Sequence, residues 1–205
     1  MHPLLGVLIS YLAGSIPFAY LAGKARHVDL RKHGSGNLGA TNAMRVLGTK
    51  WGMLVYAGDT LKGAIPVVAL PQVVSANRMD LWAIAFGVAA IIGHVKPIFL
   101  LGQGGGKGVA TTGGVFFGLA WLPTLIAFLS FALAVFITRR VSVGSLTAAV
   151  VLPAALVIER GLRDPLSLIC CVIAIFVIYL HRGNIARLRA GTEPRFGENN
   201  ERPAA

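Results

Sequence analysis

Long apolar stretches separated by short polar segments dominate this chain. The apolar runs cover residues 3–23, 51–75, 81–101, 109–137, 143–158 and 165–180. A helix needs about 20 mainly apolar residues to cross the hydrocarbon core of a bilayer, so most of these runs are long enough, or nearly long enough, to span one. The pattern therefore predicts an all-α integral membrane protein built as a bundle of transmembrane helices.

The composition supports the same class. Of the 205 residues, 55% are hydrophobic and 13% are charged, and the mean hydropathy is +0.71. Soluble domains carry about 25% charged residues, so this chain has too little charge to cover a water-facing surface. No basic leader or small-residue cleavage site is evident around the first apolar run, so we expect that run to be retained as a span.

The basic residues indicate which ends of the spans face the cytoplasm. The 19 Lys and Arg residues exceed the 8 Asp and Glu residues, which gives a net charge of +11. They gather in segment 24–50, at Arg139 and Arg140, and after Arg182. Because cytoplasmic loops of membrane proteins are enriched in Lys and Arg, we expect all three clusters on the cytoplasmic side of a bacterial inner membrane. Aromatic residues are few and lie within apolar runs, so nucleic acid is not an expected partner.

A topology follows from placing the three basic clusters on one side. With the N-terminus outside, segment 24–50 is cytoplasmic, 76–80 is outside and the glycine-rich 102–108 is cytoplasmic. Run 109–137 must then fold back near residues 121–123, so that the next basic pair returns to the cytoplasm. The result is a seven-transmembrane-helix bundle with a cytoplasm-facing site and a cytoplasmic C-terminus.

The alternative topology has five spans, with residues 143–158 lying at the membrane interface. Either arrangement forms a single domain over residues 1–205, in which the tail 197–205 is expected to be frayed. Cys170 and Cys171 are adjacent within an apolar run, so neither a disulfide framework nor a spaced metal site is expected.

The first polar motif runs from His33 to Gly48 and reads H-G-S-G-N-L-G-A-T-N-A-M-R-V-L-G. Its glycines let backbone amides approach an anion, and its arginine offers a planar fork that suits phosphate or carboxylate. The motif lacks the Walker A pattern G-x-x-x-x-G-K-[ST]. The alternative is a juxtamembrane loop whose cations contact anionic lipid head groups. The candidate phosphate-binding residues are Ser35, Gly36, Asn37, Thr41 and Arg45, with Asn42 as a further hydrogen-bonding group.

The second polar motif, Gly104 to Gly114, reads G-G-G-K-G-V-A-T-T-G-G. An ammonium, bare amides and the two threonine hydroxyls can converge there on one anion. The phosphate-binding candidates are Gly105, Gly106 and Lys107. The alternative is a flexible turn with a lysine that snorkels to the membrane surface.

The third polar motif, His181 to Glu193, reads H-R-G-N-I-A-R-L-R-A-G-T-E. An imidazole can donate to a phosphate or pass protons near neutral pH, and one helical turn would place Asn184 on the same face as His181. Arg187 and Arg189 are expected to be solvated or to face lipid, and Glu193 can pair with one of them. Ser142, which follows the basic pair at 139–140, is a further hydroxyl that either lines this site or satisfies a helix start.

Two charged residues lie inside the second apolar run. Asp59 and Lys62 have i, i+3 spacing, and a pair that faces the bundle interior is the usual solution for charges within a membrane. We expect them, like Glu193, to have a structural role first and a functional role second. His94 and Lys96 are expected to be satisfied or to snorkel. No carboxylate cluster suggests Mg²⁺ ligation, so we expect neither a metal nor a cofactor.

The motifs, in their order and spacing, resemble the bacterial acyl-phosphate:glycerol-3-phosphate acyltransferases over nearly the whole chain. The matching strings are G-S-I-P, G-S-G-N-L-G-A-T-N with Arg45, D-x-x-K-G from Asp59, G-G-K-G-V-A-T, V-S at 141–142 and H-R-x-N-I-x-R-L-x-x-G-T-E. The resemblance implies a seven-helix membrane enzyme that transfers a fatty acyl group from long-chain acyl phosphate to the 1-hydroxyl of glycerol 3-phosphate. Lysophosphatidic acid and phosphate are the implied products, and coenzyme A is not used.

The same resemblance assigns phosphate binding and orientation of the reacting groups to particular residues. One departure is Leu180, since many members have a basic residue just before the histidine of the third motif. That departure puts phosphate affinity in doubt rather than the reaction type. The assigned residues are Ser35, Asn37, Arg45, Lys107, Ser142, His181 and Asn184.

An acyl phosphate is an activated mixed anhydride, so the enzyme chiefly needs to position two anions and offset their repulsion. No H-x-x-x-x-D pair of the kind that coenzyme A-dependent glycerolipid acyltransferases use is present. We therefore expect a substrate phosphate oxygen to take the hydroxyl proton, with no covalent acyl-enzyme. The alternative functions are a transporter of a phosphorylated metabolite, which would place its site near the bilayer midplane, and a non-catalytic lipid-binding scaffold.

Overall fold

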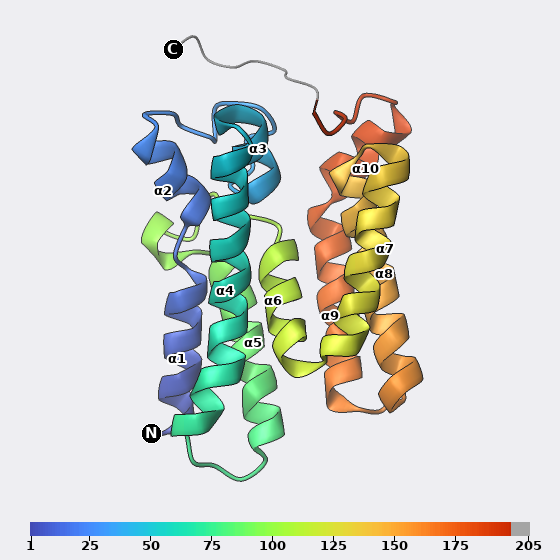
Figure 1. Ribbon diagram of the computed structural model, residues 1–205. Helices are drawn as coiled ribbons and strands as arrows, with labels where there is room; N and C mark the ends of the chain where they lie inside the picture. The colour runs from blue at the N-terminus through green and yellow to red at the C-terminus, as the bar shows by residue number, and fades with distance from the viewer. Residues whose placement is uncertain (198–205) are drawn as a thin grey trace. The chain divides into compact units, whose positions relative to one another are not determined.

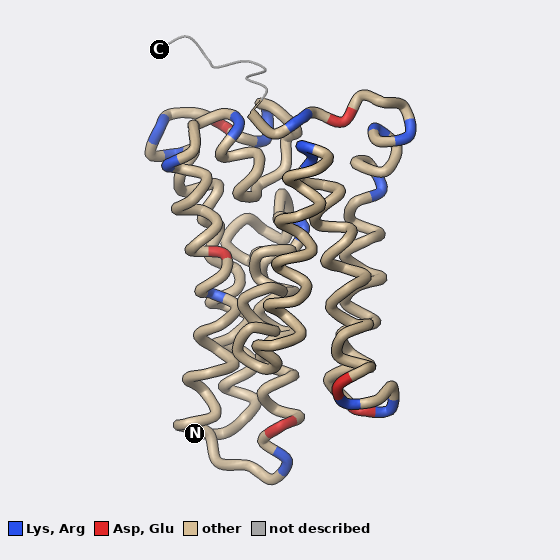
Figure 2. Tube along the Cα trace, turned by 45° about the vertical axis from the view of Figure 1, so that its right-hand side comes forward, with Lys and Arg blue, Asp and Glu red and all other residues tan. Residues whose placement is uncertain are grey.

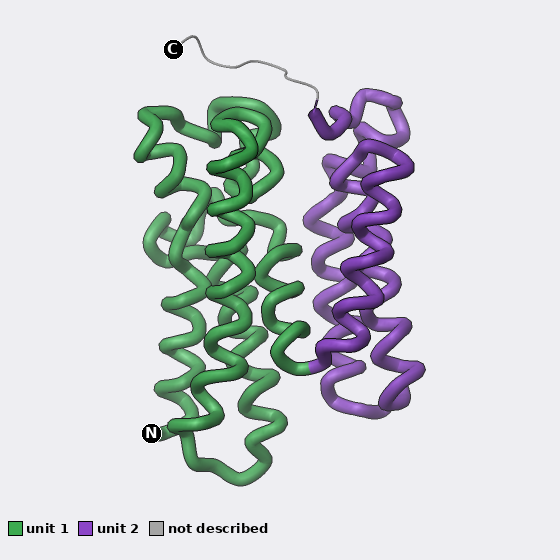
Figure 3. Tube along the Cα trace, viewed as in Figure 1, with its two compact units in different colours: residues 1–119, 199–205 green, residues 120–198 purple. Residues whose placement is uncertain are grey.

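The computed structural model describes residues 1–197, and these residues contain helices and no strand. They divide into two compact units, Met1 to Leu119 and the part that begins at Ala120, and each is described by itself (Figure 3). The expected tail lies outside the described residues from position 198 onward. Unit 1 contains α1 (Pro3–Gly14), α2 (Phe18–Ala25), α3 (Ala40–Leu47), α4 (Thr49–Val73), α5 (Met79–Val95), η1 (Ile98–Leu100) and α6 (Val109–Leu119). Unit 2 contains α7 (Trp121–Thr138), α8 (Val141–Arg160), α9 (Pro165–Leu180) and α10 (Arg182–Arg189).

Within residues 1–197, five helical segments are long and apolar enough to cross a membrane: Pro3–Ala25, α4, Met79–Leu100, α7 and α8. The pair α9 and α10, bent by 55°, would make a sixth if counted as one span. Residues 1–197 are therefore all-helical and have the features of an integral membrane protein. The seven-segment count and the membrane side of the site stay predictions.

The expected interruption of run 109–137 is present, because α6 ends at Leu119 and α7 begins at Trp121. Helix α6 has 11 residues. It is therefore about 16 Å long, roughly half of the hydrocarbon core. Helix α8 covers the run that the five-span alternative placed at the interface, and its length and apolar character suffice for a span.

The first apolar run is not one continuous helix. The chain leaves helical geometry between α1 and α2, where Pro17 lacks a backbone N–H and adopts φ −92° and ψ 75°. The break leaves the Ile16 carbonyl without a regular helical donor. It accepts instead from the Phe18 amide at 3.2 Å and from the Lys62 ammonium at 2.8 Å. A backbone carbonyl outside regular helix at membrane depth requires such a hydrogen-bond donor. The G-S-I-P string, which contains Pro17, is the local cause of the break.

Helix α4 forms the centre of unit 1 and packs against α1, α3, α5 and α6 (Figure 1). Gly63 and Gly114 allow α4 and α6 to approach backbone to backbone, because a Cβ at Gly63 would collide with the Thr111 carbonyl and one at Gly114 with the Thr60 carbonyl. The side chains of Leu61, Ile65 and Val68 on α4 are exposed, as expected of a lipid-facing surface. Gly63 and Gly114 thus set the position of α6, whose first residues belong to the second motif.

The charged residues of unit 1 gather near its two ends. The Met1 ammonium donates to the Val73 carbonyl at 3.0 Å, so the N-terminus lies beside the end of α4. Helices α2 and α3 form the opposite end of the unit, where the basic segment 24–50 lies (Figures 1 and 2). This relative arrangement is the one that the basic clusters predict. The charged pair within α4, visible along that helix in Figure 2, lies between the two ends.

In unit 2, α8 packs against α7 and α9, and α10 follows α9. Asp164 caps the start of α9, where its Oδ1 accepts from the amides of Leu166 at 3.0 Å and Ser167 at 3.2 Å. Pro165 occupies the first helical position, which needs no amide donor. The short polar loop before α9 therefore contains its own helix start signal.

Candidate active site

The first motif is a loop that Asn42 holds from the first turn of α3. The Asn42 Oδ1 accepts from the Ser35 amide at 2.8 Å. Its Nδ2 donates to the carbonyls of Leu30 at 3.0 Å and His33 at 3.1 Å. Because Asn42 is only 1% exposed, these bonds form away from water and fix the loop's course. The sequence suggested Asn42 only as one more polar group, and a carboxamide just after a glycine-rich loop was the available signal.

Two glycines with positive φ place Ser35 at the surface of this loop. Gly34 has φ +61° and Gly36 has φ +70°, a backbone region that L residues with a Cβ rarely adopt. A Cβ at Gly34 would also collide with the Asn42 Oδ1. Ser35 is therefore exposed while its amide is held.

The other candidates of the first motif lie beside this loop. Asn37 is half-buried, and a Cβ at Gly39 would come within 2.8 Å of its amide nitrogen. Thr41 is exposed at the start of α3, and Arg45 is half-buried four residues later. Residues at i and i+4 share a helix face, so α3 presents a hydroxyl and a guanidinium together.

An ion pair orders the entrance to the loop. Arg31 Nε and Nη2 donate to the two carboxylate oxygens of Asp29 at 2.9 and 3.0 Å. These bonds, with a further one from the Arg31 amide, lower the pKa of Asp29 to about 2. The Arg31 guanidinium also lies 5.7 Å from the centre of the Tyr20 ring. The cations of segment 24–50 are therefore not all free to bind lipid.

The second motif lies directly against the first within unit 1. A Cβ at Gly104 would contact the side chains of Leu38 at 3.4 Å and Arg31 at 3.6 Å. A Cβ at Gly106 would come within 2.9 Å of the Leu38 carbonyl oxygen and would collide with the His94 ring. The structure thus brings the two glycine-rich motifs together. Lys107 follows, half-buried, just before α6 begins.

Thr111 and Thr112 belong to the buried part of α6 rather than to the loop surface. Thr111 is fully buried and Thr112 is 9% exposed, and neither hydroxyl has a hydrogen-bond partner among the described residues. The expectation that both hydroxyls meet an anion together with Lys107 is not supported for Thr111, because its side chain packs toward Gly63 of α4.

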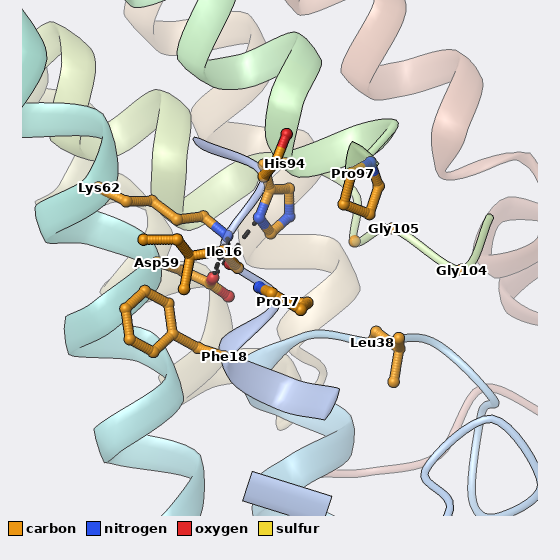
Figure 4. A pocket seen from close by; sticks show the side chains of 12 residues that line it. Ile16, Pro17, Phe18, Leu38, Asp59, Lys62, His94, Pro97, Gly104 and Gly105 are labelled. Atoms are coloured by element: carbon orange, nitrogen blue, oxygen red, sulfur yellow. Dashed lines mark hydrogen bonds and ion pairs between the residues drawn. The ribbon is translucent and has the colours of Figure 1, made fainter. Parts of the chain in front are cut away.

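Asp59 and Lys62 form the predicted ion pair, and the structure adds a third member. The Lys62 Nζ lies 2.7 Å from the Asp59 Oδ1, and the His94 Nδ1 lies 3.5 Å from the same oxygen. His94 is 6% exposed, so it does not snorkel. The three side chains border a cavity of about 10 Å³ next to Gly104–Gly106 (Figure 4), roughly the minimum space for one water molecule.

The third motif folds around Glu193 in unit 2. Its Oε1 accepts from the Asn184 Nδ2 and its Oε2 from the Arg187 Nε, both at 2.7 Å. The Arg140 Nε donates to the Glu193 carbonyl at 3.2 Å, which joins the start of α8 to the segment after α10. Arg187 is therefore paired rather than simply solvated, while Arg189 is exposed.

The partners of Glu193 determine its ionisation. Burial raises the pKa of its carboxyl, but the hydrogen bond from Asn184, the dipole of the nearby Ser142 hydroxyl, and the hydrogen bond and charge of Arg187 lower that pKa by more, so the net shift is downward. Ser142 is buried in the first turn of α8 and does not reach standard hydrogen-bond geometry with the carboxylate, although its dipole favours the anion. Glu193 is thus an anion that orients the third motif.

His181 lies between the last residue of α9 and the first residue of α10. Its Nδ1 lies 2.8 Å from the Val177 carbonyl oxygen. Since a carbonyl only accepts, this bond requires the proton on Nδ1, and the neutral ring then has its lone pair on Nε2. Asn184 lies one helical turn later, as the spacing predicts. Leu180, the residue that departs from the family pattern, is the half-buried last residue of α9.

Within each unit, then, two motifs meet: the first with the second in unit 1, and V-S with the third in unit 2.

In residues 1–197, no three His, Cys, Asp or Glu side chains are grouped closely enough to hold a metal ion. The absence of a metal requirement stays a prediction.

Comparison with known proteins identifies the family. A family model described as glycerol-3-phosphate acyltransferase matches residues 4–191. The glycerol-3-phosphate acyltransferase of Geobacter metallireducens is 50% identical over 187 residues, which cover 91% of this chain and 94% of that protein. The enzyme of the same name from Geobacter sulfurreducens is 45% identical over 197 residues, covering 96% and 98%.

Two solved structures share the fold. A crystal structure of PlsY, an integral membrane glycerol 3-phosphate acyltransferase, in its glycerol 3-phosphate form has a TM-score of 0.88 and 39% identity, covering 95% of this chain and 96% of that one. The lysophosphatidic acid form has a TM-score of 0.83 and 38% identity, covering 95% of each chain. This chain therefore belongs to the glycerol-3-phosphate acyltransferase family and is an integral membrane acyltransferase.

Proposed function

We propose that this acyltransferase uses a long-chain acyl phosphate as donor and the 1-hydroxyl of glycerol 3-phosphate as acceptor. The observation that carries the proposal is the contact between the two glycine-rich motifs. Ser35 is held at the surface between two glycines of positive φ, and Gly104–Gly106 packs against the same loop. Bare amides beside Arg45 and Lys107 suit phosphate groups, which both proposed substrates contain. Lysophosphatidic acid and inorganic phosphate are the products.

Unit 1 supplies the phosphate-binding groups in this proposal. Backbone amides at Gly105 and Gly106 donate to phosphate oxygens, and the exposed Ser35 hydroxyl adds a further donor. The Gly36 amide donates to the His33 carbonyl at 3.1 Å, so Gly36 shapes the loop instead. The two cations offset the repulsion between donor and acceptor phosphates, which is the main electrostatic barrier to bringing two anions together. Asn37 and Thr41 line the same loop and helix start.

The third motif orients the acceptor in this proposal. The bond between the His181 Nδ1 and the Val177 carbonyl holds the imidazole in place one helical turn before Asn184, where it orients the glycerol 3-phosphate. The Asn184 amide nitrogen is directed to Glu193, which sets the orientation of its amide oxygen. Ser142 lies beside the same carboxylate and completes the polar group.

The transfer is a single displacement in this proposal. The glycerol oxygen attacks the acyl carbonyl carbon and forms the C–O ester bond. The bond between the acyl carbon and the bridging phosphate oxygen breaks, and inorganic phosphate leaves with that oxygen. A phosphate oxygen takes the hydroxyl proton, so the step needs no coenzyme A, no cofactor, no metal and no acyl-enzyme. The donor is a mixed anhydride, and positioning therefore supplies much of the rate.

The site faces the cytoplasm of a bacterial inner membrane, with the N-terminus outside and the C-terminus inside, in a seven-segment bundle forming one acyltransferase domain. The basic segment 24–50 at one end of unit 1 supports this orientation. The transporter alternative receives no support from Asp59 and Lys62, because these side chains pair with each other at 2.7 Å. The cavity of about 10 Å³ beside them is too small for a metabolite.

The experiment is donor competition with detergent-purified protein and radiolabelled glycerol 3-phosphate. Palmitoyl phosphate should give labelled lysophosphatidic acid, and palmitoyl-coenzyme A and palmitoyl-acyl carrier protein should give none. Lys107→Met serves as the matched inactive control, because it keeps the length and loses the cation. Product from the thioester but not from the acyl phosphate would overturn the proposed donor.

A further inference from the structure

A buried chain of charged and polar groups connects the break in the first span to the second motif. Asp59 of α4 is 2% exposed, and its Oδ1 faces both the Lys62 Nζ at 2.7 Å and the His94 Nδ1 at 3.5 Å (Figure 4). Lys62 continues to the Ile16 carbonyl at 2.8 Å. Its ammonium also lies 5.6 Å from the centre of the Phe18 ring. One carboxylate thus links α4, α5 and the junction of α1 with α2.

His94 also packs against the glycine segment Gly104–Gly106 of the second motif. A Cβ at Gly106 would lie within 2.7 Å of the His94 Cε1 and closer still to its Nε2, so the ring packs against that backbone. A Cβ at Gly105 would lie 2.7 Å from the His94 carbonyl oxygen and would collide with the Val95 carbonyl. The position of His94 therefore limits where the segment just before Lys107 can lie.

The His94 ring can position the glycine segment only if the ring itself is held in place. Its buried Nδ1 forms no regular hydrogen bond within residues 1–197, and Asp59 is the anion that faces it. The charged groups that line the cavity beside the ring are Asp59 and Lys62. A buried ion pair is weak support for stability by itself, because apolar replacements of similar volume are often tolerated. Because the His94 ring of this group packs against Gly106, the group can position the glycine segment before Lys107.

We propose that Asp59 and His94 are positioning residues: the carboxylate fixes the imidazole, and the imidazole fixes Gly104–Gly106 against the Leu38 carbonyl of the first motif. Lys62 neutralises the carboxylate and ties it to the helix break at Ile16. The proposal rests on the proposed function only for the identity of the phosphates that the segment binds. The positioning itself concerns the backbone and can be measured without turnover.

The kinetic test uses Asp59→Asn, His94→Gln and the charge-balanced double variant Asp59→Asn/Lys62→Met. The proposal predicts that the KM for at least one phosphorylated substrate rises about tenfold in all three, while kcat per folded molecule changes less. The double variant keeps the test valid if Asp59→Asn alone does not fold, since it leaves no unpaired buried ammonium. A lower kcat with both KM values unchanged would overturn the proposal.

The second readout is hydrogen exchange of the amides in residues 102–109, measured on purified protein without substrate. Asp59→Asn/Lys62→Met should speed exchange there about tenfold, and exchange in α4 should change less. Asp80→Asn is the matched control, because it removes the same carboxylate charge from an exposed pair with Arg78. Unchanged exchange at 102–109 in the double variant would reject the positioning role. If the wild type transfers no acyl group but the double variant still exchanges faster at 102–109, only the proposed function is rejected.

Discussion

The carboxamide of Asn42 accepts a hydrogen bond from the amide of Ser35, seven residues earlier, at 2.8 Å. The same side chain donates to the Leu30 and His33 carbonyls. One buried residue outside the expected set of ligands therefore sets the conformation of the exposed hydroxyl that heads the phosphate-binding candidates. The loop's geometry depends on α3, which contains Asn42, and so on the packing of α3 against α4.

Replacing Asn42 by alanine should destabilise unit 1, because it leaves three backbone groups without their partner. We expect a loss of about 2 kcal/mol in the free energy of unfolding. Thermal unfolding in detergent measures this loss of stability, and Lys50→Gln, at an exposed position, is the control. Asn42→Asp should not restore stability, since a carboxylate cannot donate to the two carbonyls. An Asn42→Ala protein as stable as the control would show that the loop is held by other contacts.

Alanine at Gly105 should impair binding of a phosphorylated substrate, because its Cβ would collide with the Val95 carbonyl. We expect the KM to rise at least about tenfold, since backbone rather than a flexible side chain must move. Gly113→Ala is the matched control, as a Cβ there meets nothing within 4 Å. That control should keep wild-type kinetics and gain about 0.5 kcal/mol of helix stability. Equal kinetics in both variants would contradict the packing described for the second motif.

Glu193→Gln should lower stability at neutral pH, and the difference from wild type should shrink in acid. The folded-state pKa of Glu193 is lowered, so its contribution is fully present above the ordinary glutamate pKa and is lost as pH falls through the folded value. Melting temperatures of both proteins between pH 8 and pH about 3 measure this difference. A gap that stays constant or widens toward acid would contradict the ionised state assigned to Glu193.

Chelation should leave the activity intact. No cluster of three ligating side chains exists within residues 1–197, and the proposed chemistry uses amides and cations for the charge that Mg²⁺ often neutralises. Activity after treatment with EDTA and desalting, compared with a sample to which Mg²⁺ is returned, is the measurement. Recovery of lost activity only on adding Mg²⁺ would require a metal site that the proposal lacks.

The spans were predictable because apolar runs translate directly into helices. Run 165–180 coincides with α9, and run 143–158 lies within α8. The interruption near Trp121 was predictable from the charge pattern that follows it. The break between α1 and α2 was not inferred from the hydropathy, although Pro17 lies at it. The Lys62 ammonium that binds the exposed Ile16 carbonyl comes from 46 residues away. Hydropathy contains no information about that contact.

The site was predictable as a set of motifs but not as a set of contacts. Glycine patterns identified the loop around Ser35, and the spacing of Asp59 and Lys62 predicted their pair. The roles of Asn42 and His94 depend on tertiary packing, since each acts on backbone from another segment. Thr111 had the right spacing to join Lys107, but the close approach of α6 to α4 buries it instead.

Direct transfer of the acyl group from acyl phosphate to glycerol 3-phosphate distinguishes the proposed mechanism from one with an acyl-enzyme. Phosphate release in a rapid-quench experiment, with enzyme in excess over palmitoyl phosphate, separates the two. We predict no phosphate burst and no acylated protein until glycerol 3-phosphate is added, and then phosphate and lysophosphatidic acid in equal amounts. Phosphate released before the acceptor arrives, with an acyl group covalently held by the protein, would contradict direct transfer.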